Sequence, residues 1–197
     1  MANELHDFDK AYEKGHTPWD SGVPCLELVR VVNAGLLPGR KLLELGCGTG
    51  TNAVELARRG YKVTAADFVT KAVERAKLKA EAARVEIDFR VADVIKDDLG
   101  GPFDVIFDRG VYHHIRRVDL AAFLERLSAA SRKGTRWLTL AGHAGEVHQP
   151  GPPTVSEAEF RAELGTLFQF IEVREFRFGT DSDDFRPLAW SILMERK

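Results

Sequence analysis

The fold is decided by the stretch KLLELGCGTG at residues 41–50. Its first five residues form a short, largely apolar run, which is typical of a buried strand. Three glycines at alternate positions follow at once, and residues 51–59 then show the periodicity of a helix that ends at Gly60. A glycine turn between a buried strand and a helix lets a ligand approach the backbone and the positive end of the helix. The alternative is a tight strand–helix turn that binds nothing.

Short apolar runs and amphipathic stretches alternate along the rest of the chain, a pattern that predicts a parallel sheet covered by helices on both faces. The last predicted helix begins with Ser156 and has Glu159 three residues on, which is the pattern of a capping box. We therefore predict an α/β fold with a single Rossmann-like doubly wound sheet, mostly parallel with an antiparallel C-terminal strand. The sequence predicts further strands at residues 61–66, 85–91, 104–108, 136–140, 168–178 and 188–194, and helices at residues 70–83, 119–131 and 156–164.

An N-terminal segment, residues 1–33, precedes this alternation. Phe8, Ala11 and Tyr12 fall on one face of a helix that Gly15 ends. A turn-rich TPWDSGVP stretch and a short apolar helix follow. We expect this segment to form a helical lid on a cofactor-binding core at residues 41–197, and the whole chain to be one domain.

The composition is that of an ordinary globular protein, with 44% hydrophobic and 29% charged residues in a chain of 197. A net charge of -2 gives no electrostatic footprint for nucleic acid, so a small-molecule partner is favoured. No apolar run is long enough to span a membrane, and two cysteines do not make a disulfide framework. We expect a cytoplasmic protein, either a monomer or a homodimer.

The spacing of the glycines narrows the choice of ligand. A dinucleotide-binding fingerprint has the pattern G-x-G-x-x-G, but the position of its third glycine is taken here by Thr51. A P-loop needs a lysine between glycine and threonine that this turn lacks. The second predicted strand is followed by Asp67, an acid suited to holding both hydroxyls of a ribose, although an acid in this place is often a simple helix cap. The turn and the acid together predict a nucleotide-like ligand, and a dehydrogenase is disfavoured.

LLELGCGTG at residues 42–50, followed by VTAADF at residues 63–68, resembles the first two signature motifs of class I S-adenosylmethionine-dependent methyltransferases. In that family the glycine turn packs against the methionine part of S-adenosylmethionine, and the acid after the second strand holds the ribose. Phe68 matches the position that flanks the adenine, and Asp93 and Val94 match the segment at the adenine edge. The resemblance implies a cofactor site that includes Glu44, Gly46, Gly48, Gly50, Asp67, Phe68, Asp93 and Val94.

Two further segments resemble the thiopurine, thiol and halide methyltransferases. The first is FDKAYEKGHTPWDSG at residues 8–22, where aromatic residues of that group close over the cofactor. Trp19 matches the tryptophan of the group, whereas Phe8 and Tyr12 stand where its members often have tryptophan. The second is FDRG at residues 107–110, which resembles a W-D-R-G motif whose arginine lies near the substrate. The resemblance thus adds Tyr12 and Trp19 to the expected cofactor site.

A third such segment is GPPTVSEAEF at residues 151–160, and together the three imply a thiol, thiopurine or similar soft nucleophile as methyl acceptor. Pro-Trp-Asp also opens other class I methyltransferases, some acting on phenolic or quinol heterocycles, so O- or N-methylation of such a heterocycle is the alternative. Methyltransferases of nucleic-acid amines usually carry an (N/D)PP(Y/F) segment after the fourth strand, where this chain has DRGV at residues 108–111. Methylation of nucleic-acid amines is therefore disfavoured. A catalytically inactive, cofactor-binding regulatory protein is the alternative of another class.

Candidate catalytic residues lie at the end of the fourth predicted strand and just after it. Methyl transfer is an in-line displacement, so the site must hold the nucleophile about 3 Å from the methyl group. Arg109 would favour the thiolate form of a thiol acceptor, whereas His113 or His114 would serve as a general base for a phenol. Asp108 is a candidate for both catalysis and cofactor binding. The alternative for Arg109 is a simple ion pair with Asp108 or Asp104. Four histidines gather near this edge without acid or cysteine ligands at coordinating spacings, so we expect no metal. They are His113, His114, His143 and His148.

Overall fold

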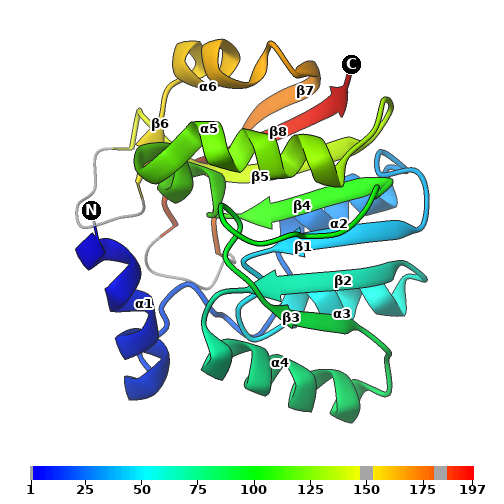
Figure 1. Ribbon diagram of the computed structural model, residues 1–197, viewed down its shortest axis with the longest axis vertical. Coiled ribbons are helices and arrows are strands. Elements are labelled where there is room, and N and C mark those ends of the chain that lie inside the picture. The colour runs from blue at the N-terminus through cyan, green and yellow to red at the C-terminus, as the bar shows by residue number, and fades with distance from the viewer. Residues whose placement is uncertain (1, 147–152, 180–185) are drawn as a thin grey trace.

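The computed structural model describes residues 2–146, 153–179 and 186–197, with side chains from residue 8 onward. The strands of the described chain are β1 Lys41–Leu45, β2 Lys62–Asp67, β3 Asp88–Val91, β4 Val105–Arg109, β5 Arg136–His143, β6 Thr154–Val155, β7 Phe168–Arg177 and β8 Leu188–Arg196. They form one twisted sheet in the order β3–β2–β1–β4–β5–β8–β7, with β6 paired to β5 outside this path (Figure 1). β8 runs antiparallel to β5 and β7, and the other pairs are parallel.

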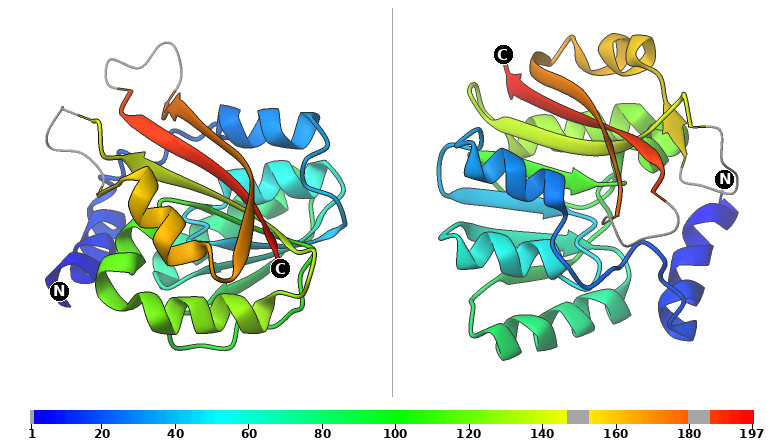
Figure 2. Two further views of the ribbon diagram at one scale, coloured as in Figure 1. Left: turned by 90° about the horizontal axis from the view of Figure 1, so that it is seen from above. Right: turned by 180° about the vertical axis from the view of Figure 1, so that it is seen from behind.

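Helices cover both faces of this sheet (Figure 2). The helices of the described chain are α1 Ala2–Lys14, α2 Leu26–Asn33, α3 Thr51–Arg58, α4 Thr70–Ala83, α5 Tyr112–Ala130 and α6 Glu157–Leu164. Buried side chains of α5 and α6 contribute to one hydrophobic core, and those of α2 and α3 contribute to a second one. None of these helices is both long and apolar enough to cross a membrane.

The apolar run that marks β1 is explained by its place between the two cores. Leu42 belongs to the core beneath α2 and α3, whereas Leu43 and Leu45 belong to the core beneath α5 and α6. All three side chains are fully buried, and burying one leucine side chain stabilises the fold by about 2 kcal/mol. A strand covered on both faces has no polar alternation, which is why the sequence shows a nearly continuous apolar run.

The order of the strands fixes where a ligand can bind. β1 pairs with β2 on one side and with β4 on the other, so the chain winds outward from β1 in both directions. In such sheets a crevice opens beyond the carboxyl ends of the strands where the winding reverses. Helix α1 lies across this edge, beyond the arrowheads of β1, β2 and β4 (Figure 1). The predicted α/β class, with a mostly parallel sheet and an antiparallel C-terminal strand, is confirmed.

Some predicted boundaries were wrong. Helix α5 begins at Tyr112 rather than at Asp119, so the histidines that follow β4 lie on its first turn. Asp119 has non-helical dihedral angles (φ -156°, ψ 85°), and its Oδ1 accepts a hydrogen bond from the backbone N of Ala122 at 3.0 Å, so it kinks the helix and starts its second half. β3 is shorter than predicted, and the short β6 was not predicted. The capping box at Ser156 is present.

Candidate cofactor and acceptor site

The glycine turn after β1 allows close approach of neighbouring elements. Gly46, Gly48 and Gly50 all have left-handed φ values, of 62°, 53° and 78°. A Cβ atom on Gly48 would lie 2.8 Å from the Tyr12 hydroxyl, and one on Gly50 would lie 2.8 Å from the Ala76 Cβ of α4. The glycines therefore admit protein contacts as well as a ligand, and any side chain at Gly48 would push the lid away from the turn.

Asp67, the last residue of β2, is held at the turn by two backbone groups. Its Oδ2 accepts a hydrogen bond from Gly48 N at 2.8 Å, and its Oδ1 accepts one from Val69 N at 2.9 Å. Burial raises the pKa of this carboxyl group, and the two hydrogen bonds oppose that rise. Each carboxylate oxygen can accept more than one hydrogen bond. Asp67 is thus oriented while keeping capacity for two further donors, as the hydroxyls of a ribose would require.

Glu44 on β1 has a buried oxygen that lacks a partner. The residue is 2% exposed, and its Oε2 has no hydrogen bond to the residues that the structure describes. Burial raises the pKa of its carboxyl group to about 8, although nearby Asn52 and Arg109 oppose the rise. A buried carboxyl oxygen without a partner is costly, and a cationic partner would remove that cost. The amino group of S-adenosylmethionine is such a partner, so Glu44 fits the cofactor that the sequence predicts.

Aromatic side chains of the N-terminal segment form a cluster over the crevice. Trp19 Nε1 donates a hydrogen bond to the Tyr12 hydroxyl at 3.1 Å, and Tyr12 is 3% exposed. The Phe8 ring packs edge-on against Trp19, Phe68 and His114, with ring centroids 5.2, 6.1 and 5.3 Å apart. The cluster therefore joins α1 to the loop after β2 and to the first turn of α5, and it can exclude water from the crevice.

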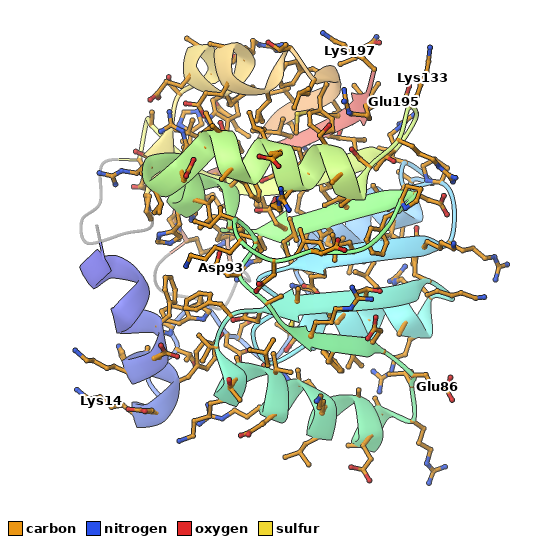
Figure 3. The ribbon with its side chains drawn as sticks, viewed as in Figure 1. Lys14, Glu86, Asp93, Lys133, Glu195 and Lys197 are labelled. Carbon is orange, nitrogen blue, oxygen red and sulfur yellow. The ribbon has the colours of Figure 1, made fainter. Side chains whose placement is uncertain are left out.

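The expected adenine wall lies at the carboxyl ends of β2 and β3. Phe68 is 37% exposed, whereas Val94 is 8% exposed. Asp93 Oδ1 accepts a hydrogen bond from Ile95 N at 3.0 Å, and its Oδ2 lies 2.6 Å from Lys96 Nζ. In Figure 3, Asp93 lies at the edge of the sheet that α1 covers, whereas Glu86 and Lys133 are at the opposite edge. The three predicted adenine contacts therefore lie on the crevice side.

Arg109, the last residue of β4, joins the lid to the C-terminal strands. Its Nη1 donates to the carbonyl oxygen of Trp19 at 2.8 Å, and its guanidinium carbon lies 4.9 Å from the centroid of the Phe178 ring. Its Nε is buried with no hydrogen-bond partner in the described chain. Asp104 pairs instead with Arg132, and no ion pair between Arg109 and Asp108 is found among the described residues. Arg109 thus brings a positive charge with unused hydrogen-bonding capacity to the crevice.

The structure does not bring the Asp108 carboxylate into the crevice. The side chain is fully buried, and its Oδ1 accepts hydrogen bonds from Val111 N at 3.0 Å and Tyr112 N at 3.1 Å. Its Oδ2 accepts one from Trp137 Nε1 at 2.9 Å. Burial raises the pKa of this carboxyl group to about 6, and these hydrogen bonds oppose that rise. Both oxygens start α5 and anchor Trp137, so the structure gives Asp108 an internal role, and its contact with cofactor or acceptor stays a prediction.

His113 is also engaged inside the protein. It is 2% exposed, and its Nδ1 accepts a hydrogen bond from Gly142 N at 2.7 Å. Burial lowers the pKa of this imidazole well below its usual range. In the neutral ring the proton must then sit on Nε2, so neither nitrogen is ready to accept a proton from an acceptor. This side chain therefore ties α5 to β5, which disfavours it as a general base, and that role stays a prediction.

The other predicted histidines are separated. His114 faces the Phe8 ring of the lid. His143 stacks on Trp190, with ring centroids 4.1 Å apart, and its Nδ1 accepts from Gly145 N at 2.8 Å. Within the described residues, no group of three or more histidine, cysteine or acidic side chains is placed to hold a metal ion. The fourth histidine, His148, and the first two residues of the GPPTVSEAEF segment, Gly151 and Pro152, lie outside the described ranges.

Relatives of known name are similar in sequence over most of the chain. Residues 42–134 match a protein family described as a methyltransferase domain. The chain is 30% identical over 175 residues to a probable thiol methyltransferase 2 of Arabidopsis thaliana, covering 87% of this chain and 77% of that protein. It is 26% identical over 200 residues to a 2-heptyl-1-hydroxyquinolin-4(1H)-one methyltransferase of Mycobacteroides abscessus, covering 94% of this chain and 87% of that protein.

A solved structure extends the likeness to the whole fold. It was determined in work on the conversion of a disulfide bond into a thioacetal group during echinomycin biosynthesis. It superposes with a TM-score of 0.81 at 28% identity, over 96% of this chain and 90% of that chain. The chain belongs to the class I S-adenosylmethionine-dependent methyltransferases.

This methyltransferase uses S-adenosylmethionine as its cofactor, and more distant members of the fold were solved with that compound or its demethylated product bound. The cofactor fits the residues present, because Glu44 offers an unpartnered buried oxygen and Asp67 a fixed carboxylate with spare acceptor capacity. Sequence reasoning missed Phe178, the stacking partner of Arg109. No local signal could have identified it, since the contact depends on where the C-terminal strands return to the crevice.

Proposed function

We propose that this methyltransferase methylates a small acceptor through a thiolate or a similarly soft, already anionic nucleophile. The observation that carries the proposal is the state of Arg109. Its guanidinium group is held over Phe178 and under the lid, and its Nε is buried without a partner in the described chain. A fixed cation stabilises the anionic form of a neighbouring thiol and lowers its pKa.

The bound cofactor would be held by residues around the glycine turn. We propose that Asp67 holds the ribose hydroxyls, that Glu44 pairs with the amino group, and that Phe68 and Val94 border the adenine with Asp93. Residues 1–33 would act as the lid on a core at residues 41–197, with Tyr12 and Trp19 covering the turn. Bound S-adenosylmethionine supplies an activated sulfonium methyl group. The chain's own task is then to position the nucleophile about 3 Å from the methyl group, opposite the sulfur, and to exclude water.

The hydrogen bonds of Asp108 and His113 support an acceptor that brings its own negative charge. Both side chains follow β4, where a general base is expected, and both are used internally. A thiol with a pKa of about 8.5 is roughly 30-fold more ionised at neutral pH than a phenol with a pKa of about 10. With neither Asp108 nor His113 ready to serve as a base, the site favours thiols over phenols. Two relatives agree with sulfur chemistry: one is named probable thiol methyltransferase 2, and the other was solved in work on the conversion of a disulfide bond into a thioacetal group.

A second candidate is O- or N-methylation of a phenolic or quinol heterocycle. The 26% identical hydroxyquinolinone methyltransferase favours it. His114 would be the base in that case, because its ring faces Phe8 under the lid.

A methyl-transfer panel tests the acceptor class. The chain would be incubated with S-adenosylmethionine labelled in its methyl group and, separately, small thiols, thiopurines, iodide, phenols and hydroxyquinolines. We expect labelled product from thiols or thiopurines at a kcat/KM at least tenfold above that of any phenol or hydroxyquinoline. Faster transfer to the oxygen or nitrogen acceptors would overturn the proposal in favour of the second candidate. Tight cofactor binding with no transfer across the panel would count against the whole acceptor class.

A further inference from the structure

A chain of hydrogen bonds ties the lid to the back of the glycine turn. Lys79 Nζ of α4 donates to Thr49 Oγ1 at 2.7 Å, and Thr49 Oγ1 donates in turn to Asp20 Oδ2 at 2.6 Å. Lys79 Nζ also donates to Thr51 Oγ1 at 2.6 Å. Asp20 directly follows Trp19 of the lid, whereas Thr49 lies within the glycine turn and Thr51 begins α3.

The direction of these bonds is fixed by the chemistry of the lysine. An ammonium group only donates, so Thr49 must accept from Lys79, and its single hydroxyl proton is left for Asp20. Thr49 is 8% exposed, and a charge-assisted hydrogen bond is stronger away from water. Because the Lys79 ammonium group donates to two hydroxyl oxygens, its position is fixed. The chain of bonds therefore presents one oriented donor to Asp20.

The place of Asp20 makes this bond a constraint on the lid. The preceding residue, Trp19, donates to Tyr12 through its ring and accepts from Arg109 through its carbonyl oxygen. The lid turn is thus held at three points: by α1, by β4 and by the glycine turn. Of these, the bond to Thr49 joins the lid directly to the segment expected to lie along the cofactor.

We propose that Thr49 and Lys79 are positioning residues that keep the lid closed over the bound cofactor by acting through Asp20. Neither needs to touch the cofactor or the acceptor. Cofactor release then requires the bond between Thr49 and Asp20 to break, so these residues set the residence time of the cofactor. This inference rests on the lid role proposed above.

The test is the dissociation rate of S-adenosylhomocysteine from the full chain. The complex would be mixed with excess unlabelled compound, and the loss of labelled compound followed over time. The variants are Thr49→Val, which removes the hydroxyl, Thr49→Ser, which restores it, and Lys79→Met. Lys77→Met is the matched control, because Lys77 is an exposed lysine on the same helix.

Thr49→Val and Lys79→Met are expected to release the compound about tenfold faster, the change expected for one hydrogen bond to a charged group. Thr49→Ser and Lys77→Met should release it within about twofold of the parent rate. Equal rates for Thr49→Val and Thr49→Ser, or for Lys79→Met and Lys77→Met, would overturn the proposal. A lower unfolding midpoint with an unchanged release rate would do the same, since it indicates a purely structural role.

Amide hydrogen exchange of residues 8–22 gives an independent readout. Faster exchange is expected in the complexes of Thr49→Val and Lys79→Met than in that of Thr49→Ser. Identical exchange would contradict the proposed positioning role of Thr49 and Lys79. No acceptor is needed in either experiment. The experiments therefore test the positioning role of Thr49 and Lys79 separately from the proposed thiol acceptor, and either proposal can be overturned without the other.

Discussion

Asp67→Asn is expected to weaken the binding of S-adenosylhomocysteine by about 100-fold while leaving the fold intact. The carboxylate accepts from Gly48 N and Val69 N and keeps capacity for two hydroxyl donors. An amide has one accepting oxygen, so its NH2 group must take the place of the other oxygen and face the backbone N–H and the ribose hydroxyl on that side. Hydrogen bonds to a charged group contribute about 1.5–3 kcal/mol each, and losing one or two of them corresponds to this change in affinity.

Calorimetry at pH 7, with thermal unfolding in parallel, measures both effects. Burial raises the pKa of Asp67, so losing the charge does not itself lower stability at this pH, and the one backbone hydrogen bond that an amide cannot accept should cost only about 1 kcal/mol. Asp88→Asn is the matched control, because Asp88 is an exposed acid at the other end of the neighbouring strand β3. Binding by Asp67→Asn within threefold of the parent would remove this residue from the cofactor site.

Arg109→Ala is expected to lower kcat/KM for a thiol acceptor by about 100-fold, a loss typical of removing one preorganised charge from a reaction site. Affinity for S-adenosylhomocysteine should change far less, because Arg109 touches the lid only through the Trp19 carbonyl. Steady-state kinetics at saturating cofactor, together with calorimetry, separate the two quantities. Equal losses in both, or no loss in either, would exclude Arg109 from acceptor binding.

The matched control for this substitution is Arg75→Ala. Arg75 Nη2 of α4 also donates to a lid carbonyl, that of Tyr12, at 2.9 Å. Its loss loosens the lid without removing the charge at the end of β4. We expect Arg75→Ala to affect cofactor affinity more than acceptor turnover, the opposite of Arg109→Ala.

The central βα units could be predicted from the sequence because their signals are local. The apolar run of β1, the glycine turn and the helix 70–83 each depend on neighbouring residues, and the structure has them where the pattern indicated. The first turn of α5 could not be predicted in this way. Its polar start is stabilised by Asp108, which in turn is held by Trp137 from the neighbouring strand. That contact exists only after the sheet has formed.

The residues of the candidate site likewise include some with a local sequence signal and others that depend on distant contacts. Asp67 and the glycine turn follow from spacing, and the segment with Trp19 follows from a resemblance. The internal roles of Asp108 and His113 were missed, because their partners Trp137 and Gly142 lie 29 residues further along the chain. The link from Asp20 to Thr49 spans a similar distance, so no periodic pattern records it.

The central claim is that the acceptor binds as an anion and needs no general base of the enzyme. The pH dependence of kcat/KM for two thiols of well-separated pKa tests this claim most directly. It would be measured with S-adenosylmethionine saturating, so that the titration of Glu44, with its pKa of about 8, does not limit the rate through cofactor binding. In this pH dependence kcat/KM reports the ionisation of the free acceptor and of the enzyme groups that react with it. We predict that kcat/KM rises with pH to a plateau and that the midpoint moves with the pKa of each thiol. A midpoint common to both thiols would contradict the claim, because it would belong to a general base of the enzyme.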